Sequence, residues 1–198
     1  MPVTKFRDPY AHLAPPGKLL ALDPGLRECG VAVFAQGTLV DAGLVKNTFR
    51  RGGGLDAIHE MVGLVTRRVR EDGPFDRVVV EVPQIYMIGK GKGDPNDLLA
   101  LAQIGACVGW ALRAVGPKGN NEVVQVRPAE WKAQMDKDVC RRRILGTHGV
   151  PGRLDELEME RLAPALEEAG AKDHNVVDAV GIGLHSLGRF ERRRVITR

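Results

Sequence analysis

The first part of the chain carries three short apolar runs that are separated by turn residues. The runs cover 19–22, 29–35 and 38–45, with Asp23-Pro24-Gly25 after the first and Gln36-Gly37 after the second. Apolar runs of this length bounded by Gly, Pro and Asp predict β-strands. Short connections suit antiparallel neighbours, so we expect a three-stranded antiparallel meander.

After Arg51-Gly52-Gly53-Gly54 the pattern changes to alternating helices and strands. Apolar side chains recur at helical spacing over 55–71, and Val78 to Val80 form a β-branched run that is typical of a strand buried on both faces. Further helices are expected at 98–116, 139–145, 155–169 and 173–190, a further strand at 122–126, and loops at 83–97 and 149–152. Alternation of strands and helices favours parallel pairing, so the predicted fold is α/β with a mixed five-stranded sheet flanked by helices.

Composition narrows the class of protein. The 198 residues are 43% hydrophobic and 27% charged, which indicates one globular domain rather than disorder. We expect a loose lead-in at 1–17, the domain at 18–190 and a basic tail at 191–198. The most apolar stretch, 98–112, is shorter than the roughly 20 residues that span a bilayer, and the N-terminus lacks the apolar core of a signal peptide, so we expect a cytoplasmic protein with no membrane partner.

Charge and cysteine usage point to a polyanionic partner in a reducing compartment. The formal net charge is +4, which weakly favours nucleic acid. Cys29, Cys107 and Cys140 are far apart, and no pair has zinc-ligand spacing. A structural zinc and a disulfide framework are therefore both disfavoured.

Three acids stand out by their positions. Asp23 ends the first strand, Glu81 ends the valine-rich strand, and Asp178 lies in the apolar stretch 176–182. Each alone has an ordinary explanation: a turn residue before Pro-Gly, a carboxylate paired with Lys or Arg, or a polar residue on a half-exposed helix. Together they suggest a hard-cation site, because buried carboxylates need counter-charge. Oxygen ligands suit Mg²⁺ or Mn²⁺, and two such ions about 4 Å apart promote phosphodiester hydrolysis.

The same residues lie in motifs that resemble a known family. LLALDPGLRECGVAVF with Asp23, Gly25 and Gly30, VVVEVP with Glu81, and NVVDAVGIGLH with Asp178 look like the ordered motifs of the RuvC Holliday junction resolvases. VRPAEWK, which contains Lys132, is similar to the stretch after their last strand. The resemblance runs from about residue 18 to 190. EVPQIY, the GKGKGDPND loop and DHNVVDAVGIGLH look more like bacteriophage or divergent bacterial members.

The resemblance implies a ribonuclease-H-like fold and symmetrical nicking of four-way or otherwise branched DNA by a homodimer that uses Mg²⁺ or Mn²⁺, with two ions per site and no organic cofactor. It implies that Asp23, Glu81 and Asp178 are metal ligands and that Lys132 belongs to the catalytic group. It also implies localisation with the nucleoid of a bacterial or phage-infected cell.

The fourth metal ligand of the family, an acid or histidine three residues before the last Asp, is where this sequence departs. Asn175 occupies that position, while His174 lies four residues before Asp178 and also shares its helix face. Asp173 lies about 140° round the helix from Asp178 and is a poorer candidate. The spacing favours Asn175, which brings an oxygen but no charge, with His174 as the competitor.

Basic residues near these motifs are candidate DNA contacts. Lys90 and Lys92 lie in a glycine-rich loop after Glu81, where they can reach phosphates or form only a solvated surface. Lys132 and Arg141 resemble basic positions near the family's active site, and Arg142 and Arg143 extend the run; the alternative is a solvated helix face. Aromatic residues are too few for a single-strand stacking platform, so we expect contacts mainly to phosphates. Tyr86 is either a wedge at a junction base or a core residue.

The helix at 98–116 carries Gly105, Ala106, Gly109 and Ala111 on an otherwise apolar surface. Small residues permit close helix approach, which suits either a dimer interface or packing on the sheet. The resemblance to a dimeric family favours the dimer.

Three other functions compete with a junction resolvase. A related ribonuclease-H-like nuclease, such as the YqgF-like proteins, would act on RNA or on branched DNA in general. A junction-binding protein with a degenerate metal site would bind without cleaving, because Asn175 replaces an acid. An actin-like ATPase also opens with Asp-x-Gly, but 198 residues hold only one of the two domains that enclose the nucleotide.

Overall fold

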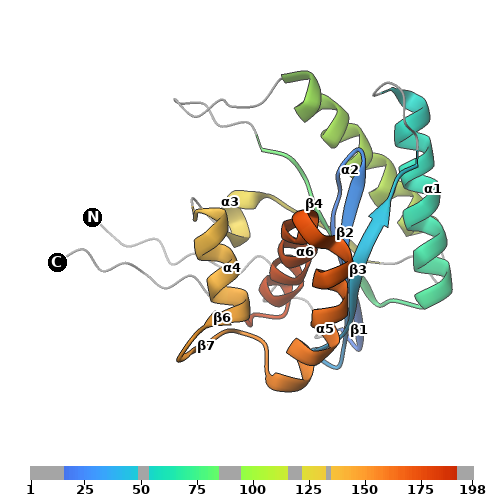
Figure 1. The fold of residues 1–198 in the computed structure, drawn as a ribbon. Coiled ribbons are helices and arrows are strands. Elements are labelled where there is room, and N and C mark those ends of the chain that lie inside the picture. The colour runs from blue at the N-terminus through green and yellow to red at the C-terminus, as the bar shows by residue number, and fades with distance from the viewer. Residues whose placement is uncertain (1–15, 49–53, 85–94, 116–121, 133–134, 191–198) are drawn as a thin grey trace, which may run out of the picture.

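A five-stranded sheet forms the centre of the molecule (Figure 1). The computed structural model describes residues 16–48, 54–84, 95–115, 122–132 and 135–190, with the strands in the order β3-β2-β1-β4-β5. The strands β1 (Lys18–Asp23), β2 (Glu28–Ala35) and β3 (Thr38–Lys46) pair antiparallel, and β4 (Arg77–Glu81) and β5 (Glu122–Val126) continue the sheet in parallel with β1. The predicted meander and the predicted mixed sheet are therefore confirmed.

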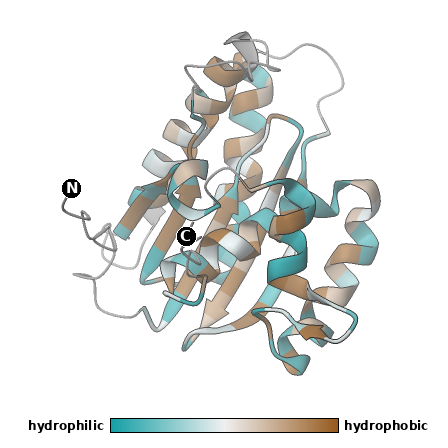
Figure 2. Cartoon of the chain, turned by 90° about the vertical axis from the view of Figure 1, so that its left-hand side faces the viewer, coloured by the Kyte–Doolittle hydropathy of each residue, from teal (hydrophilic) through white to brown (hydrophobic). Residues whose placement is uncertain are grey.

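Helices cover both faces of the sheet and divide the core into two halves. The helices α1 (Leu55–Asp72) and α2 (Pro95–Val115) pack on one face, over side chains such as Leu20 and Val78. The helices α4 (Lys137–Leu145), α5 (Glu156–Ala169) and α6 (Asp173–Ser186) pack on the other face, over side chains such as Ala21 and Val79. Hydrophobic residues follow the strands and the inner faces of the helices (Figure 2). None of the helices within the described ranges is long and apolar enough to cross a membrane.

The structure differs from the predicted elements in four places, and the first is that α2 begins at Pro95, inside the predicted loop at 83–97. The predicted loop at 149–152 contributes to a hairpin of β6 (Gly146–Thr147) and β7 (Val150–Pro151), and a short helix α3 (Pro128–Trp131) precedes α4. The last helix ends at Ser186, before the predicted 190, because Gly188 adopts a positive φ and the chain turns so that Arg189 N–H and Phe190 N–H both donate to Leu184 O. The lead-in up to residue 15, the loop at 85–94 and the tail at 191–198 lie outside the described residues.

Helix α6 lies unusually close to β2. A Cβ atom added to Gly30 would lie 1.9 Å from the backbone oxygen of Asn175, and one added to Gly183 would lie 2.1 Å from the ring of Phe34. Glycine at both positions lets the helix approach the strand. Since Gly30 pairs with Asp23 across β1 and β2, this approach also brings the start of α6 to the end of β1.

A buried ion pair fixes the chain after α6. The carboxylate of Glu158 on α5 is fully buried and accepts hydrogen bonds from Arg189 Nη1 (2.7 Å) and Nη2 (2.6 Å), and from the backbone N–H groups of Leu39 (2.7 Å) and Asp155 (3.0 Å). Burial alone would raise the pKa of Glu158. The hydrogen bonds, above all those from the Arg189 guanidinium, outweigh burial and hold this pKa below its usual value. The pair therefore links α5, β3 and the end of the domain.

Candidate active site

Two of the three predicted acids lie at the same edge of the sheet. Leu22 of β1 pairs with Val80 of β4 in a parallel register, so the next residues, Asp23 and Glu81, follow side by side at the carboxyl ends of the two strands. Asp178 approaches from α6, where its side chain is 12% exposed in an otherwise buried stretch. The alternative of a half-exposed Asp178 is therefore wrong, and the three acids belong to one electrostatic group.

Lys132 joins two of these carboxylates. Its Nζ lies 2.7 Å from Asp178 Oδ2 and 3.8 Å from Glu81 Oε2, and it lies 4.6 Å from the centre of the Trp131 ring. Trp131 is fully buried, and its indole Nε1 donates to Glu81 Oε2 at 2.5 Å. One dipeptide at the end of α3 therefore supplies an ammonium and an N–H donor to the acidic group.

The local sequence explains why this dipeptide is well placed. Pro128 begins α3, and the Glu130 carboxylate accepts a hydrogen bond from the backbone N–H of Arg127 at 2.6 Å, which is one half of a capping box. The N–H of Ala129 donates to Gln84 Oε1 at 3.2 Å, which ties α3 to the chain after β4. A capped, tethered turn of this kind orients the two side chains that follow it.

Burial and the charges of neighbouring carboxylates raise the proton affinity of Asp23 and of Glu81. Burial is the main cause that raises the pKa of Asp23 well above its ordinary value, and the charges of Glu81 and Asp178 add to it. Burial also raises the pKa of Glu81, although Lys132 and the Trp131 N–H oppose the shift. Burial disfavours the Lys132 ammonium, but the carboxylates outweigh it and raise the pKa of Lys132 above its ordinary value. Among the described residues, Lys132 is the ammonium within ion-pair distance of these acids, so negative charge exceeds positive charge in this part of the site.

The donor set suits a divalent cation by charge and by chemistry. Three carboxylates offer hard oxygen ligands of the type that Mg²⁺ and Mn²⁺ prefer. Within the described ranges, however, no three His, Cys, Asp or Glu side chains are close enough as they stand to hold a metal ion. Binding would therefore require the carboxylates to turn towards a common point, with Lys132 giving up part of its contact to Asp178.

A small cavity of about 160 Å³ opens beside Asp178. His174 lines this cavity together with Lys137 and Arg141, whereas Asn175 is not among its lining residues and packs its backbone against Gly30. Arg141 Nη1 forms an ion pair with Asp173 Oδ2 at 2.5 Å at the same place. The structure therefore brings the competitor His174, rather than the favoured Asn175, into the space next to Asp178.

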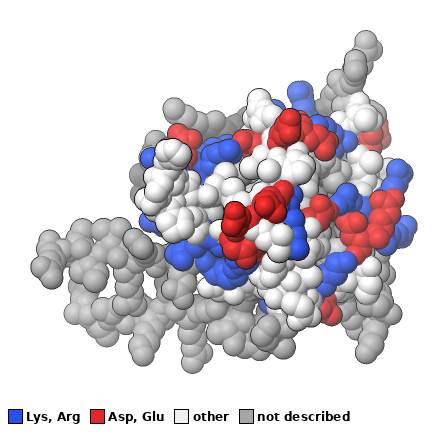
Figure 3. All heavy atoms as spheres, turned by 60° about the horizontal axis from the view of Figure 1, so that its bottom comes forward, with Lys and Arg blue, Asp and Glu red and all other residues white. Residues whose placement is uncertain are grey.

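The other predicted residues are distributed unevenly. Arg141 lines the cavity at Asp178, whereas Arg142 and Arg143 line a second pocket away from it. Lys90, Lys92 and Tyr86 lie outside the described residues. On the face shown in Figure 3, basic side chains gather in several patches between acidic ones.

Sequence reasoning missed two contributors to the site. Trp131 binds Glu81, and the charge of Lys137 opposes the raised pKa of Asp23. The signals available were the Trp-Lys dipeptide after Pro128 and the Lys at the start of a basic helix.

Helix α2 presents an apolar outer face. Leu99 is 63% exposed and Trp110 is 78% exposed, with Cys107 also exposed between them. Gly105 and Gly109 instead face the sheet, where an added Cβ would lie 3.5 Å from Val82 and 3.6 Å from Val123. Gly105 and Gly109 therefore serve packing on the sheet, whereas Ala106 is exposed on the same outer face as Cys107 and Trp110.

Comparison with known proteins places the fold. No family model and no curated protein matches the sequence. Among solved structures, RuvC of T. thermophilus in complex with a Holliday junction substrate matches with a TM-score of 0.51 at 16% identity, over 85% of this chain and 90% of that one. The yeast mitochondrial Holliday junction resolvase Ydc2 matches with a TM-score of 0.54 at 11% identity, over 91% of this chain and 82% of that one. The chain therefore shares the fold of these two Holliday junction resolvases.

Proposed function

We propose that this protein is a divalent-metal-dependent endonuclease that nicks four-way DNA junctions. The observation that carries the proposal is the meeting of Asp23, Glu81 and Asp178 around Lys132, in a chain with the resolvase fold. Buried acids with raised pKa values at a strand edge are costly for folding and are typical of functional sites.

The chain's own residues have separable roles in this proposal. Asp23, Glu81 and Asp178 would hold Mg²⁺ or Mn²⁺, with His174 or Asn175 as the fourth candidate. When bound, such ions activate water and stabilise the leaving oxygen of a phosphodiester. Trp131 holds Glu81 in place through its N–H group, and Lys132, which pairs with Asp178, supplies a positive charge that could stabilise a phosphate bound beside the carboxylates.

Basic residues beside the acids support a phosphate-containing substrate. Lys137 and Arg141 line the cavity at Asp178, where they can face the strand that is cut. Lys90 and Lys92 stay predicted contacts from the loop after β4. We expect Lys90→Ala with Lys92→Ala to lower the slope of log affinity against log salt by about 0.9 for each phosphate that the variant no longer neutralises. An unchanged slope would mean that this loop makes no phosphate contact.

The outer face of α2 supports assembly of two copies. A four-way junction offers two related strands, and a two-fold dimer would place one site at each. Leu99 and Trp110 would be buried at the interface, and Cys107 lies between them in sequence on the exposed face. A short bis-maleimide reagent should therefore cross-link two copies through Cys107, and Cys107→Ser should abolish the cross-link because the other two cysteines are buried.

The experiment that tests the proposal compares an immobile four-way junction with a flap, a duplex and an RNA–DNA hybrid, each with Mg²⁺ or Mn²⁺. Paired nicks on opposite strands of the junction are the expected result. Asp23→Asn or Glu81→Gln should abolish cleavage and keep junction binding, because each removes a metal ligand and lessens repulsion of DNA. Faster cleavage of the hybrid or flap would instead indicate a related nuclease, and loss of binding in step with cleavage, with the fold intact, would refute the assigned roles.

A second candidate is a junction-binding protein that does not cut. The observation that favours it is the absence, in the described part of the chain, of three ligands already arranged for a metal. Tight junction binding with no nicks in either metal, and no change in melting temperature on adding metal, would support this candidate.

A further inference from the structure

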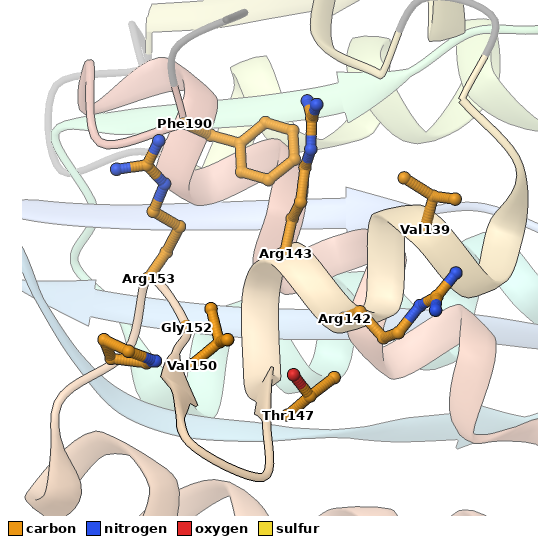
Figure 4. A pocket seen from close by; sticks show the side chains of 9 residues that line it. Val139, Arg142, Arg143, Thr147, Val150, Gly152, Arg153 and Phe190 are labelled. Atoms are coloured by element: carbon orange, nitrogen blue, oxygen red, sulfur yellow. The ribbon is translucent and has the colours of Figure 1, made fainter.

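The hairpin β6–β7 and helix α4 enclose a basic pocket of about 510 Å³ (Figure 4). Arg142 and Arg143 enter it from α4, and Arg153 enters from the chain after β7. Thr147 of the hairpin adds a hydroxyl group, and Val150 and Phe190 contribute apolar walls. Three arginines from two separate segments therefore line the pocket, and their guanidinium groups point in different directions (Figure 4).

Backbone contacts fix the position of the segment that carries Arg153. Its N–H donates to the oxygen of Ile144 in α4 at 2.9 Å, and its own oxygen accepts from Arg189 Nη2 at 3.0 Å. A Cβ added to Gly152 would lie 2.3 Å from Ile144 O, so the segment after β7 lies directly against the end of α4. Arg142 Nε donates to Asp138 O at 3.2 Å. The backbone that carries these arginines is therefore held in position by contacts within the protein itself.

The positive charge of the pocket is not neutralised from within. No acidic residue is among its lining residues, and within the described ranges Arg143 and Arg153 form no ion pair. Two neighbouring arginines behave differently, since Arg141 pairs with Asp173 and Arg189 pairs with Glu158. Basic residues in the last turn of α4 also complement the helix dipole, but that effect does not explain an arginine contributed by the hairpin segment.

The pocket and the carboxylate site lie on different sides of α4. Lys137, Asp138 and Arg141 line the cavity at Asp178, whereas Val139, Arg142 and Arg143 line the basic pocket. At 100° per residue the two sets point roughly 150° apart. A helix is about 10 Å wide, so a strand that contacts both sides of α4 would meet them at phosphates that are not adjacent.

We propose that this pocket binds the phosphodiester backbone of the nucleic acid at a phosphate outside the carboxylate site, on the other side of α4. Guanidinium groups match phosphate geometry, and an uncompensated, partly walled pocket strengthens that attraction. The proposal deepens the proposed function and rests on it for the identity of the substrate. It adds Arg153 to the binding surface and separates Arg142 and Arg143 from the residues around the cut.

The test uses a double variant of the pocket, Arg143→Gln together with Arg153→Gln. Its control is a second double variant, Arg67→Gln together with Arg70→Gln. The control changes net charge equally, and its exposed arginines lie on α1, over the opposite face of the sheet. Affinity for an immobile junction is measured in EDTA over a range of salt concentrations, so no cleavage is needed. We expect the pocket pair to lower the slope of log affinity against log salt by about 0.9 to 1.8, and the control pair to leave it unchanged. Lysine at both pocket positions should restore the slope, because the charge is kept.

Methylphosphonate substitution, which removes the charge of one phosphate at a time, locates the contact. For the wild type, substitution at one position should weaken binding several-fold, and in the pocket variant the same substitution should have no further effect. In a second measurement, inorganic phosphate is added to the wild type and to the pocket variant, and the change in melting temperature of each is compared.

The outcomes separate the pocket from the proposed nuclease. A reduced slope supports the pocket even if no metal gives cleavage. An unchanged slope in a folded variant overturns the pocket while leaving the nuclease intact. Stabilisation by inorganic phosphate that the pocket variant does not show, with an unchanged DNA slope, would indicate a small-anion site and overturn the proposal. Wild-type protein that binds no nucleic acid overturns both.

Discussion

Replacing Gly30 by Ala should disturb the candidate site through the backbone alone. The new Cβ would lie 1.9 Å from the oxygen and 2.5 Å from the carbonyl carbon of Asn175, whereas Cβ atoms essentially never lie within 3.0 Å of such a neighbour. The start of α6 must therefore move by at least about 1.1 Å. Asp178 lies three residues further on, about 4.5 Å along the helix, and would move with it.

The expected effect has two parts. Overpacking of this kind costs about 3 kcal/mol of unfolding free energy, which corresponds to a fall in melting temperature of about 6 to 12 °C for a domain of this size. A displacement of about 1 Å at a reacting group costs about 100-fold in rate. Thermal unfolding measures the first part without any assumption about function, and junction cleavage in Mg²⁺ at a temperature well below melting measures the second.

Gly43→Ala provides a matched control. Gly43 lies on β3, opposite Val31, and a Cβ added there meets nothing within 4 Å. It should leave cleavage unchanged and alter stability by less than about 1 kcal/mol, in the stabilising direction, because alanine restricts the unfolded chain. If Gly30→Ala melts and cleaves like Gly43→Ala, the close approach of α6 to β2 does not position Asp178, and the reasoning fails.

Three further variants test other contacts. Arg189→Met should destabilise the protein by about 3 kcal/mol at pH 7, because it leaves the buried Glu158 carboxylate without its counter-charge. The pKa of Glu158 is lowered in the folded protein, so this loss of stability should shrink as the pH falls towards 4. A loss that chemical denaturation finds to be independent of pH would contradict this prediction. Trp131→Phe removes the N–H group that donates to Glu81 at 2.5 Å. It should lower the free energy of unfolding by about 2 kcal/mol and raise the Mg²⁺ concentration needed for half-maximal cleavage. An unchanged Mg²⁺ requirement would mean that Trp131 does not position Glu81. His174→Ala should lower the cleavage rate about tenfold or more and change the preference between Mg²⁺ and Mn²⁺, because His174 lines the cavity beside Asp178. If Asn175→Asp instead raises cleavage in Mg²⁺ and His174→Ala leaves the cleavage rate unchanged, the ligand is Asn175, as the spacing in the sequence predicts.

Local pattern determined the elements of this fold and the strand ends that carry two acids. The valine run 78–80 and the amphipathic repeat over 55–71 gave β4 and α1 nearly to the residue, because period and β-branching act over a few neighbouring positions. The C-terminal end of α6 could not be predicted from local pattern in the same way. Its apolar pattern continues to 190, but Gly188 with a positive φ and the buried pair at Arg189 end the helix at Ser186, and that pair depends on a residue 31 positions away.

Contacts between distant segments decided the site itself. Trp131 and Glu81 are 50 residues apart, and only the parallel pairing of β4 with β1 and β5 brings the indole to the carboxylate. The run Arg141 to Arg143 reads as one basic segment in the sequence, yet successive residues on a helix point about 100° apart and meet different partners. Arg141 pairs with Asp173 beside the acids, whereas Arg142 and Arg143 line the pocket between α4 and the hairpin, because tertiary packing, rather than the helix, determines what lies against each side.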